Sequence, residues 1–333
     1  MSNLILPNDN YVKKPLVSIL VPIYNVEKYI ESCLDSLFNQ RYISVNDIEF
    51  IFVDDCGSDS SMRILERYIT RYEFKGFNIK VISNNSNQGL AECRNIALRI
   101  AKGYYIMHVD SDDYIESNAI YELLQASNNC TADIVLSDVY FDYENRISVC
   151  HNNVPNDKIA YISLMLKRKL MFNIWGKLIR RSLYTTNNIS TVPGINQGED
   201  YSVYPRLVFV ARNVVKIDKP LYHYVQTNPN SYCKLINRTS IDQILYAQKI
   251  NTDFFKDKIK NQILCESKLA TKMSLLIGGS KQDYAYINKQ YIDIPILKTK
   301  MPIKYKIILI LMLCKCYSIV YFILKKMYAH NVK

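Results

Sequence analysis

Short runs of β-branched and other apolar residues alternate with segments whose apolar side chains recur at helical spacing. The first run is residues 17–23, and the segment that follows it, residues 27–40, has apolar positions three and four residues apart. The alternation recurs three more times, and it predicts strands at 48–53, 79–83 and 104–109 and helices at 60–72, 90–101 and 117–126. Repeated strand–helix pairs of this kind predict an α/β fold with a parallel sheet.

Each predicted strand is followed by a polar segment. In open α/β sheets ligands bind beyond the carboxyl ends of the strands, so a binding site is expected in these segments. Asn, Asp, Gly and Ser are also ordinary turn residues, and one such segment alone would carry little weight. All four strands share the feature, which favours a site over simple turns. The polar segments are residues 22–25, 54–59, 84–89 and 110–113.

The most acidic of these segments holds Asp110, Asp112 and Asp113. Between Gly103 and Asn145 there are nine acidic residues and no Lys or Arg, so no cation close in sequence neutralises them. Two carboxylates about 4 Å apart repel by roughly 4 kcal/mol at an effective dielectric constant near 20. Converging carboxylates therefore need a divalent cation or a shared proton. Oxygen ligands favour Mg²⁺ or Mn²⁺, and such ions commonly join carboxylates to substrate phosphates, which indicates a diphosphate-bearing substrate.

Length and cysteine pattern indicate a globular cytoplasmic protein. The 333 residues, 49% of them hydrophobic, suffice for one sizeable core and a smaller appendage. The nine cysteines are scattered, without a CxxC pair or a Cys/His spacing typical of zinc, and this pattern fits a reducing compartment. Residues 1–14 are polar and contain no apolar run of signal-peptide length. We therefore expect an N-terminal arm at 1–15 and an active domain that faces the cytoplasm.

The net charge of +11 is concentrated at the end of the chain. Residues 241–333 hold 16 lysines, no arginine and 6 acidic residues, a balance of +10, so the first 240 residues are nearly neutral. A nucleic-acid-binding protein would spread basic residues and aromatics over its folded core, and this distribution disfavours that class. The lysines instead flank the apolar run 307–324, which indicates a membrane surface as partner.

Five motifs in order resemble those of family 2 glycosyltransferases. Trp-Gly-Lys-Leu at 175–178 and Tyr-His-Tyr at 222–224 are also similar to segments of bacterial members that make surface polysaccharides. The resemblance covers about two thirds of the chain and implies a GT-A fold, with a Rossmann-like mixed sheet, over residues 16–230. The five motifs are Val-Ser-Ile-Leu-Val-Pro-Ile-Tyr-Asn at 17–25, Phe-Val-Asp-Asp at 52–55, Asn-Gln-Gly-Leu-Ala-Glu-Cys-Arg-Asn at 87–95, Asp-Ser-Asp-Asp at 110–113 and Gly-Glu-Asp at 198–200.

The resemblance assigns the nucleotide base to the first two motifs. Pro22 and Tyr24 would lie along the base, and Asn25 belongs to the same donor-binding segment. Asp54 or Asp55 would accept a hydrogen bond from a ring N–H of the base. UDP is the nucleotide that the resemblance favours. One departure is Cys-Gly at 56–57, where many members have Gly-Ser.

The later motifs are assigned to the diphosphate and the metal. By the resemblance, Asp112 and Asp113 would share the ribose hydroxyls and a Mn²⁺ or Mg²⁺ ion, and Asp110 would order their loop. Arg94 is similar to a residue near the donor diphosphate. Its other interpretation is a cation on the surface of the helix predicted at 90–101.

The acceptor hydroxyl must lose its proton as it attacks the sugar, so a carboxylate is needed as general base. Asp200 of the Gly-Glu-Asp motif is the candidate, and Glu199 would position the acceptor or the loop. A single displacement inverts the anomeric centre, so an inverting hexosyl- or N-acetylhexosaminyltransferase is expected. The structural alternative is that both carboxylates form the acidic first turn of a helix over 201–212, where the helix dipole favours them.

Other classes of protein account for fewer of these features. A sugar-nucleotide nucleotidyltransferase also uses aspartates and a metal, but it should have a Gly-rich phosphate loop with a basic residue after its first strand, and residues 22–25 are not one. A non-catalytic membrane-surface protein would carry its basic residues over the folded core. A processive synthase would have Gln-x-x-Arg-Trp and several spans. We expect transfer of one sugar to a hydroxyl of a saccharide or lipid-linked acceptor, with no nucleic-acid partner.

The last third of the chain predicts helices. Residues 218–300 have apolar side chains at spacings near 3.6, and 231–300 are assigned to a helical extension. In the tail, residues 301–333, Lys315 interrupts the apolar run and argues against a simple span.

The spacing of the tail lysines predicts how the tail meets the membrane. Lys304, Lys315 and Lys326 are 11 residues apart and would share one face of a single helix. We expect this helix to lie in the headgroups on the cytoplasmic face of the inner membrane, as in a peripheral protein. A helix that covers an apolar surface of the protein or of a second subunit, and a true span, are the alternatives.

Three ring side chains carry less weight. Trp175 is expected in the core rather than as a stacking platform for the acceptor. His108 and His223 could contact phosphate, but His108 falls inside the strand predicted at 104–109, where a hydrogen-bonded structural role is at least as well supported.

Overall fold

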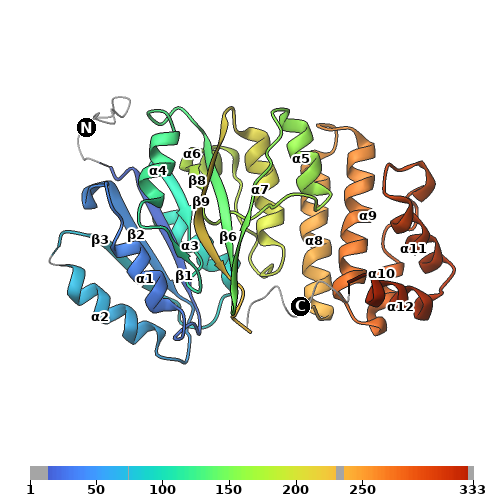
Figure 1. The fold of residues 1–333 in the computed structure, drawn as a ribbon, viewed down its shortest axis with the longest axis horizontal. Helices are drawn as coiled ribbons and strands as arrows, with labels where there is room; N and C mark the ends of the chain where they lie inside the picture. Colours follow the sequence, from blue (N-terminus) through green and yellow to red (C-terminus); the bar gives the residue numbers. More distant parts are fainter. Residues whose placement is uncertain (1–13, 74, 230–235, 329–333) are drawn as a thin grey trace. The chain divides into compact units, whose positions relative to one another are not determined.

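The computed structural model describes residues 14–73, 75–229 and 236–328, and they form two compact units (Figure 1). The unit that we call the sheet unit consists of Met1–Val154 and Asn173–Pro229, and the helical unit consists of Pro155–Phe172 and Asn230–Lys333. Residues 155–172 thus join the helical unit, which the sequence did not indicate. The predicted arm at 1–15 lies almost wholly outside the described residues.

One mixed sheet of nine strands, counted over the described residues, forms the sheet unit. The strand order is β3-β2-β1-β4-β8-β6-β9-β5, and β7 pairs with β6. Strands β1 to β4 are parallel, as the strand–helix alternation predicts, whereas β8 is antiparallel to β4 and to β6, so the mixed sheet is confirmed. The strands are β1 (Val17–Ile23), β2 (Ile48–Asp54), β3 (Asn78–Ser83), β4 (Tyr105–His108), β5 (Tyr114–Ile115), β6 (Ile134–Tyr143), β7 (Arg146–Cys150), β8 (Leu178–Arg180) and β9 (Val214–Val225).

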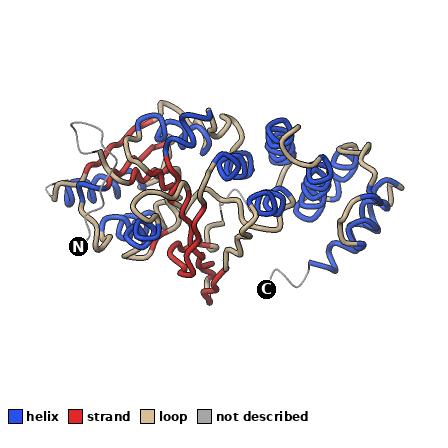
Figure 2. The backbone as a smooth tube through the Cα atoms, turned by 90° about the horizontal axis from the view of Figure 1, so that it is seen from above, coloured by secondary structure: helices blue, strands red, loops and turns tan. Residues whose placement is uncertain are grey.

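Helices lie on both sides of this sheet (Figure 2). The four strand–helix pairs that the alternation predicts are confirmed, because each of β1 to β4 is followed by a helix in the expected region. All seven residues of β1 are buried, and Phe38 of α1 packs against Phe50 and stacks on Tyr72, so the apolar periodicity marks this core. The helices of the sheet unit are α1 (Ile30–Phe38), α2 (Ser61–Glu73), α3 (Leu90–Ile100), α4 (Ala119–Ala126), α6 (Arg181–Asn187) and α7 (Glu199–Val210).

The register of the parallel strands brings their carboxyl ends to one edge. Ile23, at the end of β1, pairs with Asp54 at the end of β2, which pairs with Ser83 at the end of β3. On the other side of β1, Leu20 pairs with His108, the last residue of β4. The polar segments that follow these strands therefore share this edge, as predicted.

The helical unit has its own apolar core, to which Ile241, Leu276 and Tyr284 contribute. The prediction of helix from residue 218 is wrong up to Val225, because these residues belong to β9, which pairs with β6 and β5. From Arg238 onward the helical prediction is confirmed. The helices are α5 (Lys158–Leu166), α8 (Arg238–Phe255), α9 (Asn261–Gly278), α10 (Tyr284–Asn288), α11 (Ile303–Leu313) and α12 (Tyr317–Tyr328).

The tail is a pair of short helices rather than one. Lys315 has a left-handed backbone, with φ 59°, and it lies in the turn between α11 and α12. The prediction of one continuous helix with three lysines on one face is therefore wrong. Ile308, Leu309 and Val320 are buried in the core of the helical unit, so this pair, which we call the tail hairpin, covers an apolar surface of its own unit. Within the described residues, no helix combines the length and apolarity that crossing a membrane requires.

Candidate functional site

The loops after β1 and β2 are tied to each other. Asn25 accepts a hydrogen bond from the backbone N–H of Ser58 through Oδ1, at 2.8 Å. Asp54 accepts from the backbone N–H of Cys56 through Oδ1, at 3.0 Å. The Cys-Gly departure at 56–57 is thus compatible with a closed turn after the paired aspartates.

Asp55 holds the loop between β3 and α3. Its carboxylate accepts from the side chain of Asn84 at 2.8 Å and from the backbone N–H groups of Gln88 and Gly89 at 2.7 and 2.8 Å. Gly89 has φ +84°, and a Cβ there would lie 2.4 Å from Nδ2 of Asn196. Glycine suits this turn because other residues rarely adopt that backbone, and a Cβ would displace the Asn196 side chain, which accepts from the backbone N–H of Ala91.

Pro22 lies near the end of β1, and Tyr24 directly follows Ile23, the strand's last residue, which pairs with Asp54. Pro22 is buried, whereas Tyr24 is 43% exposed. Both oxygens of Asp55 accept hydrogen bonds from the protein, whereas the hydrogen bonds to Asp54 go to Oδ1, so Asp54 is the better placed of the two predicted partners for a base. An exposed aromatic ring can stack on a nucleotide base, and a carboxylate beside it can accept a hydrogen bond from an N–H of the base.

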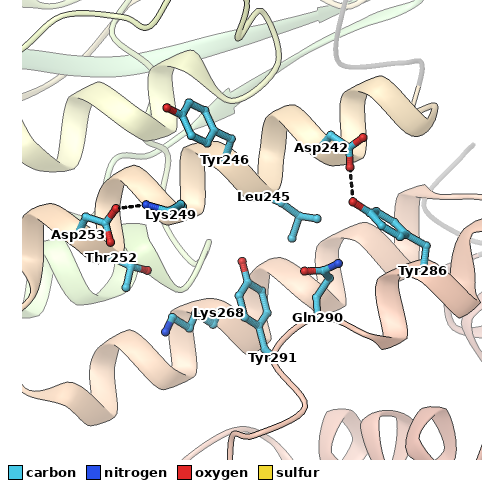
Figure 3. Close-up of a pocket in the computed structure, with 10 residues that line it drawn as sticks. All are labelled: Asp242, Leu245, Tyr246, Lys249, Thr252, Asp253, Lys268, Tyr286, Gln290 and Tyr291. Carbon is cyan, nitrogen blue, oxygen red and sulfur yellow. Dashed lines mark hydrogen bonds and ion pairs between the residues drawn. The ribbon is translucent and has the colours of Figure 1, made fainter.

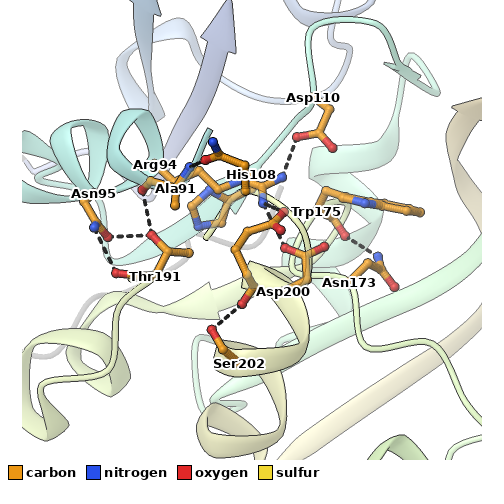
Figure 4. A network of polar contacts seen from close by, with 12 residues as sticks. Ala91, Arg94, Asn95, His108, Asp110, Asn173, Trp175, Thr191, Asp200 and Ser202 are labelled. Atoms are coloured by element: carbon orange, nitrogen blue, oxygen red, sulfur yellow. Dashed lines mark hydrogen bonds and ion pairs between the residues drawn. The ribbon is translucent and has the colours of Figure 1, made fainter. Parts of the chain in front are cut away.

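Arg94 is the centre of a buried ion-pair cluster (Figure 4). Its Nη2 donates to Oδ1 of Asp110 at 2.7 Å, and its Nη1 donates to Oε1 of Glu199 at 2.6 Å and to Oδ1 of Asp200 at 2.9 Å. The side chain is 2% exposed, so its interpretation as a helix-surface cation is wrong. One guanidinium therefore joins the loop after β4 to the first turn of α7.

Burial shapes the protonation of this cluster. Burial raises the pKa of Glu199 and Asp200, and the proximity of the two carboxylates raises that of Glu199 further. Arg94 opposes both shifts, and its own pKa is held well above its usual value by Asp110, Asp200 and Glu199 against the effect of burial. Lys177 is buried nearby, and burial lowers its pKa to about 7. A carboxylate in these surroundings is more basic than an ordinary surface one.

The first turn of α7 presents both acidic residues to the cluster. Gly198 precedes the helix with φ 95°, and α7 begins at Glu199, two residues before the predicted start. The alternative that Glu199 and Asp200 form the acidic first turn of a helix is therefore right about where they lie. Their contact with buried Arg94 goes beyond a helix-dipole role, which needs no such partner.

Asp112 and Asp113 have different surroundings. Asp113 is 1% exposed, and its oxygens accept from the Tyr222 hydroxyl at 2.7 Å and from the backbone N–H of Val225 at 2.8 Å. Asp112 is partly exposed and accepts from Nδ2 of Asn228 through Oδ2, at 2.7 Å. Both oxygens of Asp113 thus anchor the loop to β9.

The aspartates fit a cation to different degrees. Burial raises the pKa of Asp112 and of Asp113, and repulsion raises it further, chiefly from Asp110 and Asp112 respectively. A cation would relieve this repulsion, and partly exposed Asp112 fits it better than Asp113, whose oxygens are both hydrogen-bonded. Among the described residues, no three or more His, Cys, Asp and Glu side chains are grouped so as to hold a metal. An ion at Asp112 would take its other ligands from phosphate and water, as Mg²⁺ commonly does.

The site also includes four residues to which the sequence assigned no binding or catalytic role: Trp175, Lys177, Tyr222 and Asn228. Trp175 is 6% exposed and stacks on Tyr222 with ring centroids 4.4 Å apart, so its core position is confirmed. Lys177 and Tyr222 lie in segments that resemble family segments, but residue type alone assigned no role to either. Asn228 follows β9 in a segment without a sequence signal.

The two histidines have protein partners. His108 is buried with Nε2 3.3 Å from the Tyr184 hydroxyl, and burial together with Arg94 lowers its pKa well below its usual value. The ring nitrogens of His223 lie 3.0 Å from Asp142 and from Glu116. Phosphate contact by His223 would require it to exchange a carboxylate partner.

Sequence comparisons relate the chain to known glycosyltransferases. The family model described as "Glycosyl transferase family 2" matches residues 18–185. The Bacillus subtilis protein named "Uncharacterized glycosyltransferase EpsJ" is 32% identical over 241 residues, which are 70% of this chain and 67% of EpsJ. The poly(ribitol-phosphate) beta-glucosyltransferase of Bacillus spizizenii is 34% identical over 216 residues, which are 63% of this chain and 32% of that enzyme.

A solved structure shares the fold. The crystal structure of S. aureus TarS 1–349 in complex with UDP-GlcNAc superposes with a TM-score of 0.72 and 20% sequence identity, over 95% of this chain and 92% of that chain. At this identity the likeness shows the fold, which is the predicted GT-A type.

Proposed function

Because the chain belongs to glycosyl transferase family 2, we propose that it moves one sugar from a nucleotide-diphospho-sugar to a hydroxyl group, with inversion at the anomeric carbon. The acceptor is a saccharide or a lipid-linked saccharide of a bacterial surface polysaccharide. The observation that carries this proposal is the contact of Arg94 with Asp110 and Asp200, which joins the predicted donor loop to the candidate base. The family is one of glycosyltransferases, which leaves the nucleotidyltransferase alternative without support.

UDP is the proposed donor nucleotide. Exposed Tyr24 can stack on a pyrimidine base, and neighbouring Asp54 can accept a hydrogen bond from an N–H of that base. TarS, which has the same fold, was crystallised in complex with UDP-GlcNAc, and this supports a uridine nucleotide here. The transferred sugar in the proposal is a hexose or an N-acetylhexosamine.

Asp112 would hold a Mn²⁺ or Mg²⁺ ion against the donor diphosphate. When bound, such an ion offsets the negative charge that grows on the leaving diphosphate. Asp113 holds the same loop through Tyr222 and Val225, and Asp110 holds it through Arg94. We therefore assign Asp110 and Asp113 to positioning and Asp112 to direct binding.

Asp200 would remove the proton of the acceptor hydroxyl. Its side chain is 15% exposed, against 9% for Glu199, so it is the more accessible of the two carboxylates. Burial raises its pKa and makes it a stronger base, while Arg94 at 2.9 Å favours the ionised form that a base needs. Attack from the face opposite the leaving group then gives inversion in one displacement.

The tail hairpin supports a peripheral position on the cytoplasmic face of the inner membrane. From Lys298 to Lys333 the sequence has eight lysines and no acidic residue. Lysines beside exposed apolar side chains are the composition that binds anionic lipid surfaces. The hairpin would hold the enzyme near a lipid-linked acceptor. Its exposed apolar residues are Ile303, Ile307, Ile310, Leu313, Ile319, Tyr321 and Phe322.

A screen of nucleotide sugars tests the proposal. The purified protein is incubated with UDP-, GDP- and dTDP-sugars, with and without Mn²⁺, and the release of free sugar and nucleotide is followed by NMR. We expect slow hydrolysis of a UDP-sugar that depends on the metal and yields the inverted anomer first. Hydrolysis that retains the configuration, or that is equally fast without metal, would contradict the assigned mechanism, and no hydrolysis of any donor would contradict the activity.

A further inference from the structure

A hollow of about 450 Å³ lies within the helical unit (Figure 3). It lies between α8 and a surface formed by α9, α10 and the turn that follows α10. Tyr246, Tyr286 and Tyr291 line it, and Tyr246 is 50% exposed. None of the residues predicted for nucleotide or metal binding lies in this unit.

The turn after α10 is held in place by a buried cation. Lys272 is 2% exposed, and its ammonium donates to the backbone carbonyls of Asn288 and Gln290 at 2.9 and 2.8 Å. Tyr291 follows with φ 55°, which is rare for a bulky residue and costs backbone energy. Such strain persists only where the surroundings enforce it, and it is common at binding sites. The turn thus presents Gln290 and Tyr291 to the hollow in a fixed geometry.

The two carboxylates of the hollow have partners within the helical unit. Oδ1 of Asp242 accepts from the Tyr286 hydroxyl at 2.5 Å, and Oδ2 of Asp253 accepts from the Lys249 ammonium at 2.5 Å. Lys268 lies 6.0 Å from the centre of the Tyr291 ring. Arg238 lies beside the hollow, with Nε 3.7 Å from Oδ2 of Asp242. Two of these three cations are therefore paired with the two carboxylates, so the hollow lacks the cluster of free cations that attracts a phosphate or a nucleotide.

We propose that this hollow binds a neutral saccharide, at a site separate from the residues assigned to sugar transfer. Tyrosine rings can pack against the C–H faces of a sugar ring, while the carboxylates and the Gln290 amide can hydrogen-bond its hydroxyls. Pockets that combine aromatic walls with a few fixed polar groups are typical of small-ligand sites. This site does not depend on the proposed transfer reaction, because it can bind saccharide without donor or metal.

Binding of neutral trisaccharides to the full chain, without nucleotide, tests this site. A panel built from glucose, galactose or N-acetylglucosamine is titrated and followed by calorimetry and saturation-transfer NMR. We expect at least one member to bind, and Tyr246→Ala to weaken that binding about tenfold, since an aromatic contact contributes on the order of one tenfold step. Tyr321→Ala is the matched control, because Tyr321 is 40% exposed on α12 and lies outside the hollow. It should leave binding unchanged.

Three results would overturn the site. Binding that is as strong in both Tyr246→Ala and Gln290→Ala as in the unmodified protein would place the saccharide elsewhere. Binding of polyol-phosphate chains but of no neutral trisaccharide would show that the ligand is anionic. Absence of any binding would also overturn it. Donor hydrolysis is measured in parallel on the same samples and should be unaffected by Tyr246→Ala, so failure of this site is distinguishable from failure of the proposed transferase activity.

Discussion

Nη1 of Arg94 donates to Oδ1 of Asp200 over 2.9 Å, although 106 positions separate the two residues in the sequence. Arg94 lies on α3, the helix that follows the loop that Asp55 organises, and Asp200 lies in the first turn of α7. The same guanidinium holds Asp110 after β4. Arg94 thus joins its own motif to two others that are far away in the chain, and we assign it to positioning the candidate base.

We expect Arg94→Met to lower the free energy of unfolding at pH 7.5 by about 3–5 kcal/mol, because it leaves buried carboxylates without their cation. Without that cation the pKa values of the carboxyls rise in the folded protein. The loss should therefore shrink as the pH falls and these groups take up protons. Urea denaturation at pH 7.5 and 5.5 measures both effects.

Arg99→Met is the matched control for this variant. Arg99 lies on the same helix, pairs with Glu92 and has a side chain that is 61% exposed. An exposed ion pair contributes little, so we expect a change below about 1 kcal/mol. Equal losses for the two variants would contradict the buried cluster.

The sequence predicts much of this architecture because local pattern and local structure agree in the first half of the chain. The alternation of β-branched runs with helical periodicity is visible without tertiary information, and the polar strand ends follow from it. The sequence does not show how the roles of two neighbouring aspartates differ. Asp54 and Asp55 are adjacent and chemically identical, and only the β3–α3 loop, which Asp55 holds through Gln88 and Gly89, distinguishes them.

Other features depend on contacts that are distant in sequence. The burial of Arg94 results from a partner 105 positions away, and β9 is a strand because it pairs with β6. The tail breaks at Lys315, where a non-glycine residue adopts a left-handed backbone that apolar spacing does not reveal. These three corrections share one cause, since tertiary contacts override a local preference.

We expect Asp112→Ala to abolish Mn²⁺-dependent binding of UDP while the protein stays folded, because it removes the carboxylate that fits the ion best. Calorimetry with UDP, with and without Mn²⁺, measures this. Asp218→Ala removes a carboxylate whose side chain is 92% exposed and serves as the control for general charge. Metal-dependent affinity that survives in Asp112→Ala would refute the assigned position of the ion.

The acid limb of the pH profile of kcat/KM should lie above the ordinary aspartate pKa of about 3.9, because burial raises the pKa of Asp200 and the base is active only when ionised. Activity falls as the pH is lowered through this raised pKa. Lys177 lowers the pKa of Asp200, so Lys177→Met should move the limb to higher pH. An unchanged limb, or one moved to lower pH, would mean that another group controls the rate.

Membrane binding by the tail hairpin is better tested by substituting its exposed residues than by truncation. Removing the whole hairpin would uncover the core around Ile308. Ile307 and Phe322 are 50% and 69% exposed. We expect the intact protein to float with anionic but not zwitterionic liposomes, to be released by high salt, and to lose flotation in the Ile307→Ser, Phe322→Ser variant. Tyr42→Ser, at a side chain 74% exposed in the sheet unit, is the control. An intact protein that never floats with anionic liposomes would show the membrane proposal to be wrong.

The central claim is that Asp200 removes the acceptor proton, and the turnover of Asp200→Asn tests it most directly. The amide is nearly isosteric and can still pack beside Arg94, but it cannot accept a proton. With the donor identified by the hydrolysis screen, we expect the variant to bind that donor with unchanged affinity while kcat falls by about 10²–10⁴. Unchanged donor affinity with near-normal turnover would contradict the account, because Asp200 would then be a structural residue of α7 and not the base.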